Sequence, residues 1–492
     1  MRPVMGIESE YGIAAAGPCG LNEMELSNAV VRAWRAHLAE QGIGGRSWDY
    51  TTETPLQDSR GFQVERARAH PSQLTDDETM ANVVLPNGGR FYVDHAHPEY
   101  SGPECATAHD AVCHDTAGDH LAFRAAELAG QALGVPIRLW KNNTDGKGAS
   151  YGTHENYLTP RSVNFHRYVR HFTVHLVTRQ IYTGNGRVGI GTDSEIAGFQ
   201  LSQRADFFEK EVGLETTLRR PIINTRDEAH ADVRRFRRLH VITGDANRSE
   251  FATWLKLGTA RLVLQAIAEG RMDDAPELAA PVRAMHEISH DPSLRTRVEL
   301  TDGRRLTAIE IQEILLEKCA GVEDDEGILP AWARIMSALA RDPLECAHEL
   351  DWVAKLALLE RYRNRDGLDW DHPKLALIDL QYSELDPRRS LYSALVAKGR
   401  MRRLTTDADV TTAVEHPPTD TRAWFRGECV RRYGGQVVAA SWDSVMFDLQ
   451  GERTYVRIPM DDPHLGTQSA VGALLADDPD ASTLVERLGA QH

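Results

Sequence analysis

Long apolar runs are absent from this sequence of 492 residues, and none approaches the ~20 residues that a helix needs to cross a bilayer. Cysteine is scarce. The six cysteines are scattered, and none forms a Cys-x-x-Cys pair, which argues against a zinc knuckle and favours a reduced protein. The first residues have the pattern of a strand and not of a signal peptide. We therefore expect a cytoplasmic protein with no membrane partner.

Basic charge is also in short supply. Lysine and arginine together number 56 against 72 aspartates and glutamates, so the net charge is −16. Nonspecific affinity for DNA or RNA comes mainly from basic side chains at phosphates, so we expect no nucleic-acid partner, although a local basic groove is compatible with this charge. The hydrophobic content of 41% is that of a globular protein, and the length predicts a large domain with a smaller appendage, or two to three domains.

Acids and imidazoles are concentrated between Arg90 and Glu104. The first half of this stretch alternates as a strand does and places Tyr92 and Asp94 on one face. Pro98 has no N–H for a neighbouring strand, so we expect the strand to end before it. The groups gathered at this strand end are Asp94, His95, His97 and Glu99. Groups of these types bind a cation or carry out acid–base chemistry, and the alternative is a solvated turn.

Residues 4–13 have a related pattern, because Glu8 and Glu10 lie two positions apart in a predicted strand and therefore on one face. Two carboxylates side by side repel each other unless a cation or solvent separates them. Because magnesium takes carboxylate oxygens, this strand is either half of a magnesium site or an exposed edge strand.

Two further predicted strands carry polar or charged groups at positions i and i+2. His154 and Asn156 share one face of the first, which suits one metal ligand and one nucleotide contact. Arg238 and His240 share one face of the second, which suits a phosphate oxygen and a metal ion, respectively. Each histidine alone has an ordinary core or surface role as its alternative, but the recurrence of the pattern in four strands favours a common site.

Two glycine-rich segments and one tryptophan are candidates for nucleotide binding. Residues 141–157 offer backbone N–H groups that could surround phosphates, but their spacing is not that of a P-loop. Residues 183–191 fit a hairpin equally well. Trp442 is a candidate platform for adenine, with a core position in a small domain as its alternative.

Hydrophobic spacing predicts helices over residues 25–41, 106–134, 249–269, 306–320, 328–341 and 350–364, and strands over 137–140 and 172–177. Residues 374–392 add a helix or a strand. In contrast, residues 43–80 are polar and aperiodic, so we expect a mobile loop near the site that cannot pack firmly, with residues 48–62 partly ordered.

The composition becomes linker-like from Glu415 to Thr419, which predicts a domain boundary. Beyond it, short alternating segments indicate strands. We therefore expect a catalytic domain over residues 1–415 and a small C-terminal α+β domain over residues 420–492.

Charged pairs on several strands, many carboxylates and no P-loop together indicate phosphate chemistry on an open antiparallel sheet. This combination resembles the carboxylate–amine ligase superfamily of glutamine synthetase and glutamate–cysteine ligase. Within it, the chain resembles over essentially its whole length the branch that processes Pup, the prokaryotic ubiquitin-like protein. The matching stretches are residues 6–12, 92–104, 141–143, 150–156, 223–228 and 237–242. The resemblance implies an α+β fold, with a glutamine synthetase-like large domain whose curved, mainly antiparallel sheet is packed by helices, plus the small C-terminal domain.

Three features resemble the Pup deamidase/depupylase members of the branch more than the Pup ligases. They are the long insert at 43–80, the amino-acid sequence of residues 94–99 and that of residues 145–150. An additional stretch around Ala14–Gly20 departs from this pattern and has no assigned role.

The resemblance also implies roles for individual residues. The positions that match the magnesium site are Glu8, Tyr92, Glu99, His154 and His240. Those that match ATP contacts are Gly6, Ile7, Glu8, Ser9, Glu10, Gly102, Asn156, Arg238 and Trp442. Asp94 matches the catalytic carboxylate, and Arg204 and Arg226 lie where basic residues could hold the acidic C-terminal part of Pup.

The activity implied is that of a hydrolase that uses ATP, or ADP with phosphate, together with Mg²⁺. It deamidates the C-terminal glutamine of Pup and cleaves the isopeptide bond between Pup and a lysine of a pupylated protein. Asp94 would be the nucleophile or the general base toward water. One alternative is a Pup–protein ligase that forms this bond through a glutamyl phosphate. Another is a non-catalytic, nucleotide-dependent Pup-binding protein, which the retained, mutually repelling carboxylates disfavour.

Overall fold

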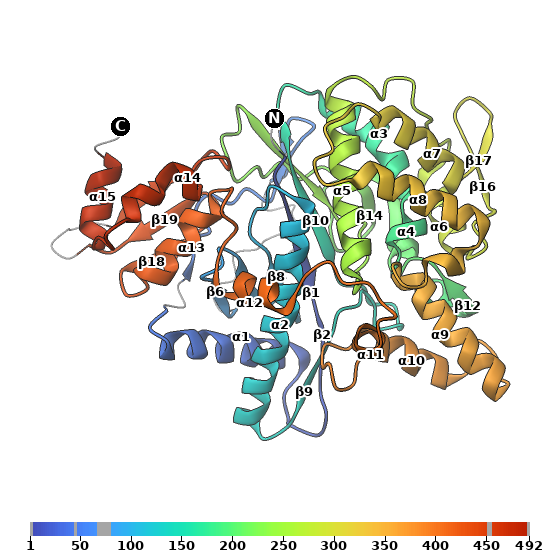
Figure 1. Ribbon diagram of the computed structural model, residues 1–492, viewed down its shortest axis with the longest axis horizontal. Helices are drawn as coiled ribbons and strands as arrows, with labels where there is room; N and C mark the ends of the chain where they lie inside the picture. The colour runs from blue at the N-terminus through green and yellow to red at the C-terminus, as the bar shows by residue number, and fades with distance from the viewer. Residues whose placement is uncertain (1–2, 44–46, 66–79, 450–454, 490–492) are drawn as a thin grey trace.

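A computed structural model describes residues 3–43, 47–65, 80–449 and 455–489. Its centre is a six-stranded sheet in the order β15-β10-β1-β8-β7-β6, in which all neighbouring strands are antiparallel (Figure 1). These strands are β1 (Met5–Glu10), β6 (Asn82–Val84), β7 (Arg90–Asp94), β8 (His97–Ser101), β10 (Thr153–Pro160) and β15 (Phe236–Val241). The predicted α+β class with a mainly antiparallel sheet is confirmed.

The stretch predicted as one strand over residues 4–13 forms two strands. β1 ends at Glu10, and β2 (Gly12–Ala15) leaves the central sheet to pair with β9 (Ile137–Trp140). Pro98, expected to lie beyond a strand end, is instead inside β8. Its carbonyl accepts the N–H of Tyr11 at 3.0 Å, so it joins the sheet as an acceptor.

Two long helices, α2 (Ala108–Leu133) and α5 (Glu250–Ala268), pack near the centre of the molecule, where α2 contacts β1 and α5 contacts β10. The side chain of Thr107 caps the N-terminus of α2, and Gly134 ends it with a left-handed φ of 70°. The hydroxyl of Ser249 caps α5 in the same way. The helices predicted at 106–134 and 249–269 are confirmed.

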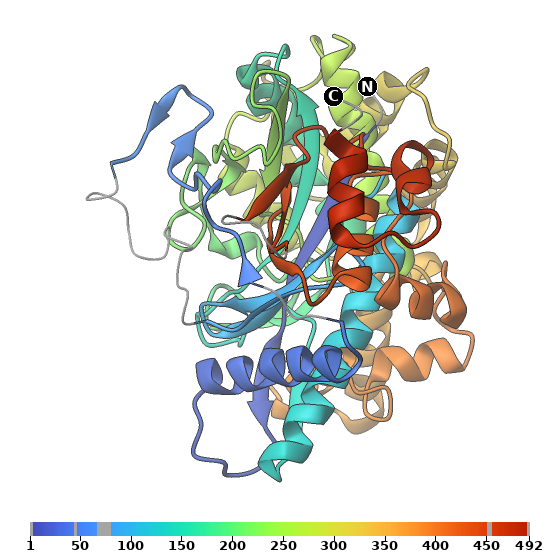
Figure 2. The same ribbon diagram turned by 90° about the vertical axis from the view of Figure 1, so that its left-hand side faces the viewer.

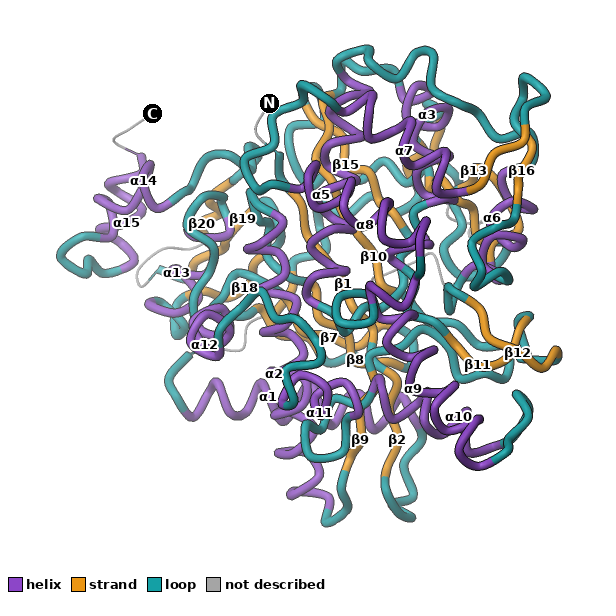
Figure 3. The backbone as a smooth tube through the Cα atoms, turned by 45° about the vertical axis from the view of Figure 1, so that its right-hand side comes forward, coloured by secondary structure: helices purple, strands orange, loops and turns teal. Residues whose placement is uncertain are grey.

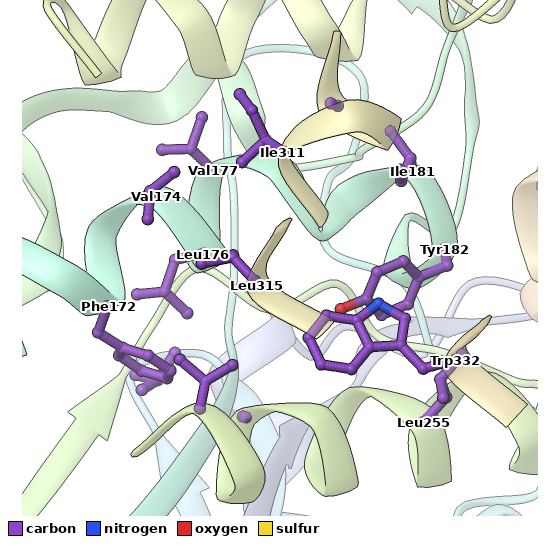
Figure 4. Packing of buried hydrophobic residues seen from close by; sticks show 14 of the residues in the cluster. Phe172, Val174, Leu176, Val177, Ile181, Tyr182, Leu255, Ile311, Leu315 and Trp332 are labelled. Atoms are coloured by element: carbon purple, nitrogen blue, oxygen red, sulfur yellow. The ribbon is translucent and has the colours of Figure 1, made fainter. Parts of the chain in front are cut away.

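The largest apolar core lies beside this sheet, among α3 (Phe165–Thr178), α5, α7 (Ala308–Cys319), α8 (Ile328–Arg341) and α9 (Asp351–Asp366) (Figure 4). Residues 172–177 were predicted to form a strand, but this is wrong, because they belong to α3. From Phe172 to Val177 the helix is buried on every side. This half of its sequence therefore lacks the polar face that reveals a helical period.

A second sheet contains strands from distant parts of the chain. Its order is β20-β19-β18-β3, and it joins β18 (Val437–Ala440), β19 (Ser444–Phe447) and β20 (Val456–Pro459) to β3 (Ser47–Trp48). Figure 2 shows these C-terminal elements, in orange and red, facing the viewer beside the blue N-terminal segment. α13 (Ala423–Arg432), α14 (Gln468–Val471) and α15 (Ala481–Gly489) complete this region.

The predicted insert does not behave as one loose loop. Trp48, Leu56 and Asp58 are buried, and the Asp58 carboxylate accepts the hydroxyl of Thr225 at 2.7 Å. The expectation that the insert cannot pack firmly is therefore wrong for residues 47–65. The part at 66–79 lies outside the described residues.

The remaining elements surround this framework. The strands are β4 (Gln57–Asp58), β5 (Phe62–Gln63), β11 (Arg187–Ile190), β12 (Ile196–Gln200), β13 (Phe208–Gly213), β14 (Arg220–Asn224), β16 (Arg297–Glu299) and β17 (Arg305–Thr307). The helices are α1 (Glu23–Glu40), α4 (Gln180–Thr183), α6 (Pro281–Ser289), α10 (Pro373–Ser383), α11 (Leu391–Ala397) and α12 (Asp407–Glu415). Within the described ranges, every helix is too short or too polar to span a bilayer. All six cysteines are free.

Candidate active site

The register of the central sheet gathers the charged residues that the sequence places far apart. Glu8 on β1 pairs with His154 on β10, and Asn156 on β10 pairs with His240 on β15. On the other side of β1, Glu10 pairs with Glu99 of β8. Figure 3 shows β7, β8, β1, β10 and β15 side by side. The charged residues of these strands therefore lie on one continuous face of the sheet.

This face lines a cavity of about 1430 Å³, which includes open solvent. Its polar lining includes Glu8, Tyr92, Asp94, His95, Glu99, His154, Arg226, Glu228, Arg238 and His240. Tyr50, Glu53 and Met80, from the ends of the insert, line the same cavity. The prediction that the insert lies near the site is thus confirmed for these residues.

Two groups of potential metal ligands lie at the cavity, each with its donor atoms within 4.8 Å of one another, and every member except Glu10 lines the cavity wall. The first comprises Glu8, His154 and His240, and the second comprises Glu10, Asp94 and Glu99. In the first group, His154 Nδ1 lies 3.3 Å from Glu8 Oε2, and Asn156 donates to the other Glu8 oxygen at 2.8 Å.

The protonation of the first group suits a cation. Burial raises the pKa of the Glu8 carboxyl, but the hydrogen bond from His154 and the positive charge of Arg238 outweigh it and hold the pKa well below its usual range. Burial and Arg238 lower the pKa of His240 far below its ordinary value. The group therefore offers an ionised carboxylate and a neutral imidazole, the forms that bind a metal ion.

In the second group, Glu99 is an acid whose ionised form is strongly disfavoured. Burial, and then the charges of Asp94, Glu10 and Glu8, raise its pKa well above the ordinary value. Three carboxylates at this distance cannot all be ionised unless a cation lies among them. The donor chemistry therefore fits Mg²⁺, which takes carboxylate oxygens. Tyr92 lies beside Glu99, but burial and that charge raise its pKa, so its hydroxyl stays protonated.

Asp94 stands at the end of β7 with its side chain 36% exposed. His95 Nδ1 lies 3.0 Å from its Oδ2. Burial raises the pKa of Asp94, but the hydrogen bond and charge of His95, followed by the charges of His154 and Arg226, lower it overall. Asp94 is therefore an ionised carboxylate that opens into the cavity, as a nucleophile or general base requires.

A second cavity, of about 540 Å³, adjoins the first. The predicted ATP contacts that line it are Gly6, Glu8, Gly102, Asn156, Arg238 and Trp442. The Trp442 indole is half-buried, with the Arg426 guanidinium 5.0 Å from its ring and Trp48 edge-on at 5.1 Å. An aromatic ring in an apolar cavity that opens onto a cluster of metal ligands fits a nucleotide whose phosphates reach the metal.

Four predicted site residues line neither cavity. Glu10, a predicted ATP contact, is one of them and lies instead against Asp94 and Glu99. The Ile7 side chain is in the apolar core, and Ser9 donates to Asp115 on α2 at 3.3 Å, because alternation along β1 turns both to the other face. Only their backbones remain available to a nucleotide. Arg204 is buried, and its Nε and Nη1 have no hydrogen-bond acceptor among the described residues, whereas Arg226 lines the larger cavity.

Several cavity residues were not among the predicted site residues. Arg90 lies 3.9 Å from the Tyr92 ring and 4.3 Å from the Trp48 ring, and this stack joins the insert to the catalytic strand. His95 and Glu228 lie in stretches that carried the family resemblance, so their proximity to the site was available as a signal. His230 had no signal, because its place follows from the path of a loop.

Comparison with known proteins agrees with this geometry. The family described as Pup-ligase protein matches residues 3–446. The chain belongs to this family. The resemblance to the Pup-processing branch is therefore confirmed.

Relatives in the Pup-ligase protein family differ in how much of the chain they match. A depupylase from Acidothermus cellulolyticus is 51% identical over 500 residues, with 99% of each chain covered. A Pup deamidase/depupylase from Mycolicibacterium smegmatis is 50% identical over 497 residues, covering 99% of this chain and 100% of the relative. A Pup–protein ligase from Acidimicrobium ferrooxidans is 40% identical and covers 80% of this chain and 89% of the ligase. The predicted preference for the depupylase group is confirmed.

Two solved structures of Pup ligases share the fold. The crystal structure of Pup in complex with its ligase PafA matches with a TM-score of 0.80 and 30% identity, covering 100% of this chain and 95% of the ligase. PafA in complex with ADP matches with a TM-score of 0.74 and 32% identity, covering 87% of this chain and 97% of that one. The fold predicted from the resemblance is therefore confirmed.

Proposed function

We propose that this protein deamidates the C-terminal glutamine of Pup to glutamate and cleaves the isopeptide bond between Pup and lysine in pupylated proteins, with a nucleotide as cofactor. The observation that carries the proposal is an ionised Asp94 open to a cavity that Glu99 also lines, with Glu10 beside both, in a chain that matches depupylases along 99% of its length. Both reactions are attacks on the γ-carbonyl of the last residue of Pup, so one site serves both.

Asp94 acts on that carbonyl in one of two ways. It attacks the carbon directly and forms an anhydride that water then hydrolyses, or it accepts a proton from a water molecule that attacks. In either case ammonia leaves in deamidation, and the lysine amine leaves in depupylation. His95, 3.0 Å from Asp94, fixes the carboxylate and keeps it ionised. None of the six cysteines replaces it as nucleophile, because five are buried and no thiol lines the cavity.

We assign the magnesium site to Glu8, Glu99, His154 and His240, with Tyr92 beside it. When bound, Mg²⁺ and the nucleotide phosphates supply the positive charge and polar contacts that stabilise a developing oxyanion. The nucleotide is ATP, or ADP with phosphate. Trp442 and the backbone around Gly6 and Gly102 would hold its base, and Asn156 and Arg238 would hold its phosphates.

Pup is held by basic groups. Arg226 lines the larger cavity and contributes to the charge that keeps Asp94 ionised, so it can face the acidic end of Pup. Arg204 is buried outside both cavities, and among the described residues its Nε and Nη1 have no acceptor, so it can bind only a group that reaches beyond the cavity wall. We place the protein in the cytoplasm, with residues 1–415 as the catalytic domain, residues 420–492 as the small domain, and no nucleic-acid or membrane partner.

The ligase is the second candidate, because the same site could phosphorylate a glutamate. The experiment that separates the two incubates the full chain with glutamine-ended Pup, ATP and Mg²⁺ and follows both the mass of Pup and the amount of ATP. The hydrolase converts Pup to the deamidated mass over many turnovers without matching ATP consumption. A ligase would consume one ATP for each bond formed with a lysine protein, and a binding protein would do neither.

The assignment of the metal site has its own test. Glu8→Ala and His240→Ala should weaken Mg²⁺–ATP binding in titration calorimetry more than they weaken Pup binding. Both residues belong to one ligand group although they lie on separate strands. Unchanged nucleotide affinity in both variants would contradict the assignment.

A further inference from the structure

His230 lies where the two cavities meet. Five residues line both cavities, namely Glu8, Ser101, His230, Arg238 and Trp442. The proposed function gives Glu8 and Arg238 to the metal and phosphate end and Trp442 to the base. The Ser101 hydroxyl faces the Tyr92 hydroxyl at 3.4 Å. His230 is the shared residue that has no role so far.

The backbone of His230 is held in an unfavourable conformation. Its φ is 47°, in the left-handed region that is unfavourable for an L-residue with a Cβ atom. The loop between β14 and β15 is fixed around it, because Ala229 is buried and Asp232 N donates to Asp461 O at 2.8 Å. Strained positions of this kind are concentrated at ligand sites, so the conformation points to a role for the ring.

The ring of His230 is nearly buried and lies at the wall of both cavities. Its Nε2 is 3.8 Å from Glu228 Oε2, which is too long for a hydrogen bond. The Glu228 carboxylate already accepts the N–H of Thr54 at 2.6 Å and faces Arg238 at 3.4 Å. The ring therefore has hydrogen-bonding capacity that Glu228 does not take up.

The protonation state of His230 fits a hydroxyl partner. Burial outweighs the charge of Glu228 and lowers the pKa of His230 to about 4, so the ring is neutral at pH 7. A neutral imidazole has one donor nitrogen and one acceptor nitrogen. A hydroxyl group also donates and accepts, so it can satisfy either nitrogen.

We propose that His230 binds a ribose hydroxyl of the nucleotide and thereby selects ribonucleotides over 2′-deoxyribonucleotides. This inference rests on the proposed function, in which the base occupies the smaller cavity and the phosphates reach the larger one. The sugar joins base and phosphates, so it lies at the junction that His230 lines.

The test compares ATP with 2′-deoxy-ATP, each with Mg²⁺, by titration calorimetry on the full chain. The wild type should bind ATP about tenfold more tightly, the effect of one hydrogen bond. His230→Gly keeps the left-handed backbone without strain and lacks the ring, so it should bind both nucleotides equally. The control is Asp477→Gly, which relieves a similar φ of 63° at an exposed residue outside both cavities and should keep the preference.

Equal binding of the two nucleotides by the wild type would overturn the inference alone. So would a preference that survives in His230→Gly or, if that variant does not fold, in His230→Phe, which keeps an aromatic ring but no nitrogen. A wild type that binds neither nucleotide would overturn the inference and the proposed function together.

Discussion

Two buried carboxylates on the central sheet have opposite surroundings. Glu155, on β10, is fully buried and makes a bidentate pair with Arg179, with N···O distances of 2.8 and 2.5 Å, and it also accepts the hydroxyl of Tyr157. Glu99, on β8, is 2% exposed and faces Asp94 and Glu10. The first acid is neutralised by the protein, and the second is crowded by charges of its own sign.

The electrostatics of the two acids follow from this difference. Burial raises the pKa of Glu155, but Arg179 and Lys256 outweigh it and lower the pKa overall. At Glu99 burial and the neighbouring carboxylates act in the same direction and raise the pKa. The sheet gives Glu155, on one face, a basic partner. Glu99, on the other face, has only acidic neighbours in the second ligand group, which indicates that a cation completes the site.

The largest expected effect concerns the reaction itself. Asp94→Asn should fold, bind ATP and lose hydrolysis by about 1000-fold or more, because the acting carboxylate is gone. Its melting temperature should fall slightly, since His95 and Arg226 stabilise the ionised carboxylate that the substitution removes. Deamidation of Pup by mass spectrometry and a thermal melt check both parts. Near-normal turnover by a folded Asp94→Asn would contradict the assignment.

The next effect concerns Glu155, the acid that Arg179 neutralises. Arg179→Met leaves Glu155 buried without its partner and should destabilise the protein by about 3–5 kcal/mol. Replacing both residues, as Arg179→Met with Glu155→Leu, should recover much of this loss, because no charge then remains unpaired. Denaturant unfolding measures both variants. A single variant as stable as the wild type would show that this pair does not hold the sheet as described.

A buried histidine away from the site gives a smaller effect, which depends on pH. Burial lowers the pKa of His114 to about 4, below the ordinary value of 6.5. The neutral ring therefore contributes stability above pH 6.5, and this is lost as the pH falls toward 4, by roughly 3 kcal/mol. His114→Gln should reduce the fall in unfolding free energy over this range. An identical pH dependence in the variant would rule out His114 as a source.

The smallest effect concerns Glu99 in the absence of metal. Its raised pKa means that the folded protein disfavours the ionised acid, which costs stability at neutral pH, where the unfolded chain would leave it ionised. Glu99→Gln removes this cost and should stabilise the metal-free protein by about 1 kcal/mol, the scale of one pKa unit. Unfolding in the presence of a chelator measures it. A clear loss of stability would mean that the Glu99 carboxyl makes contacts that the amide cannot replace.

The sequence predicts which side chains share one face of a strand better than it predicts which strands pair. Alternation placed Glu8 with Glu10 and Arg238 with His240, and the structure keeps both pairs on the cavity side. The register that sets Glu8 opposite His154 is a pairing between distant segments, and only the family resemblance linked them beforehand. His230 could not be found at all, since a left-handed φ at a histidine leaves no local pattern.

The structural errors have related causes. The second half of α3 is buried on every side and has no polar face, so its apolar run resembled a strand. The insert seemed unable to pack because its own residues are polar, but Trp48 pairs through its strand with Ala440, which lies far away in the sequence. Local composition cannot reveal stability that a segment obtains from a distant partner.

The most direct test of the central claim is a thermal-shift titration with Mg²⁺ and ADP on the wild type and Glu99→Gln. The claim is that the crowded carboxylates of the cavity face are completed by a cation. The account predicts that Mg²⁺ raises the melting temperature of the wild type and that Glu99→Gln, which starts out more stable, loses most of this increase. An increase of the same size at the same Mg²⁺ concentrations in both proteins would contradict it.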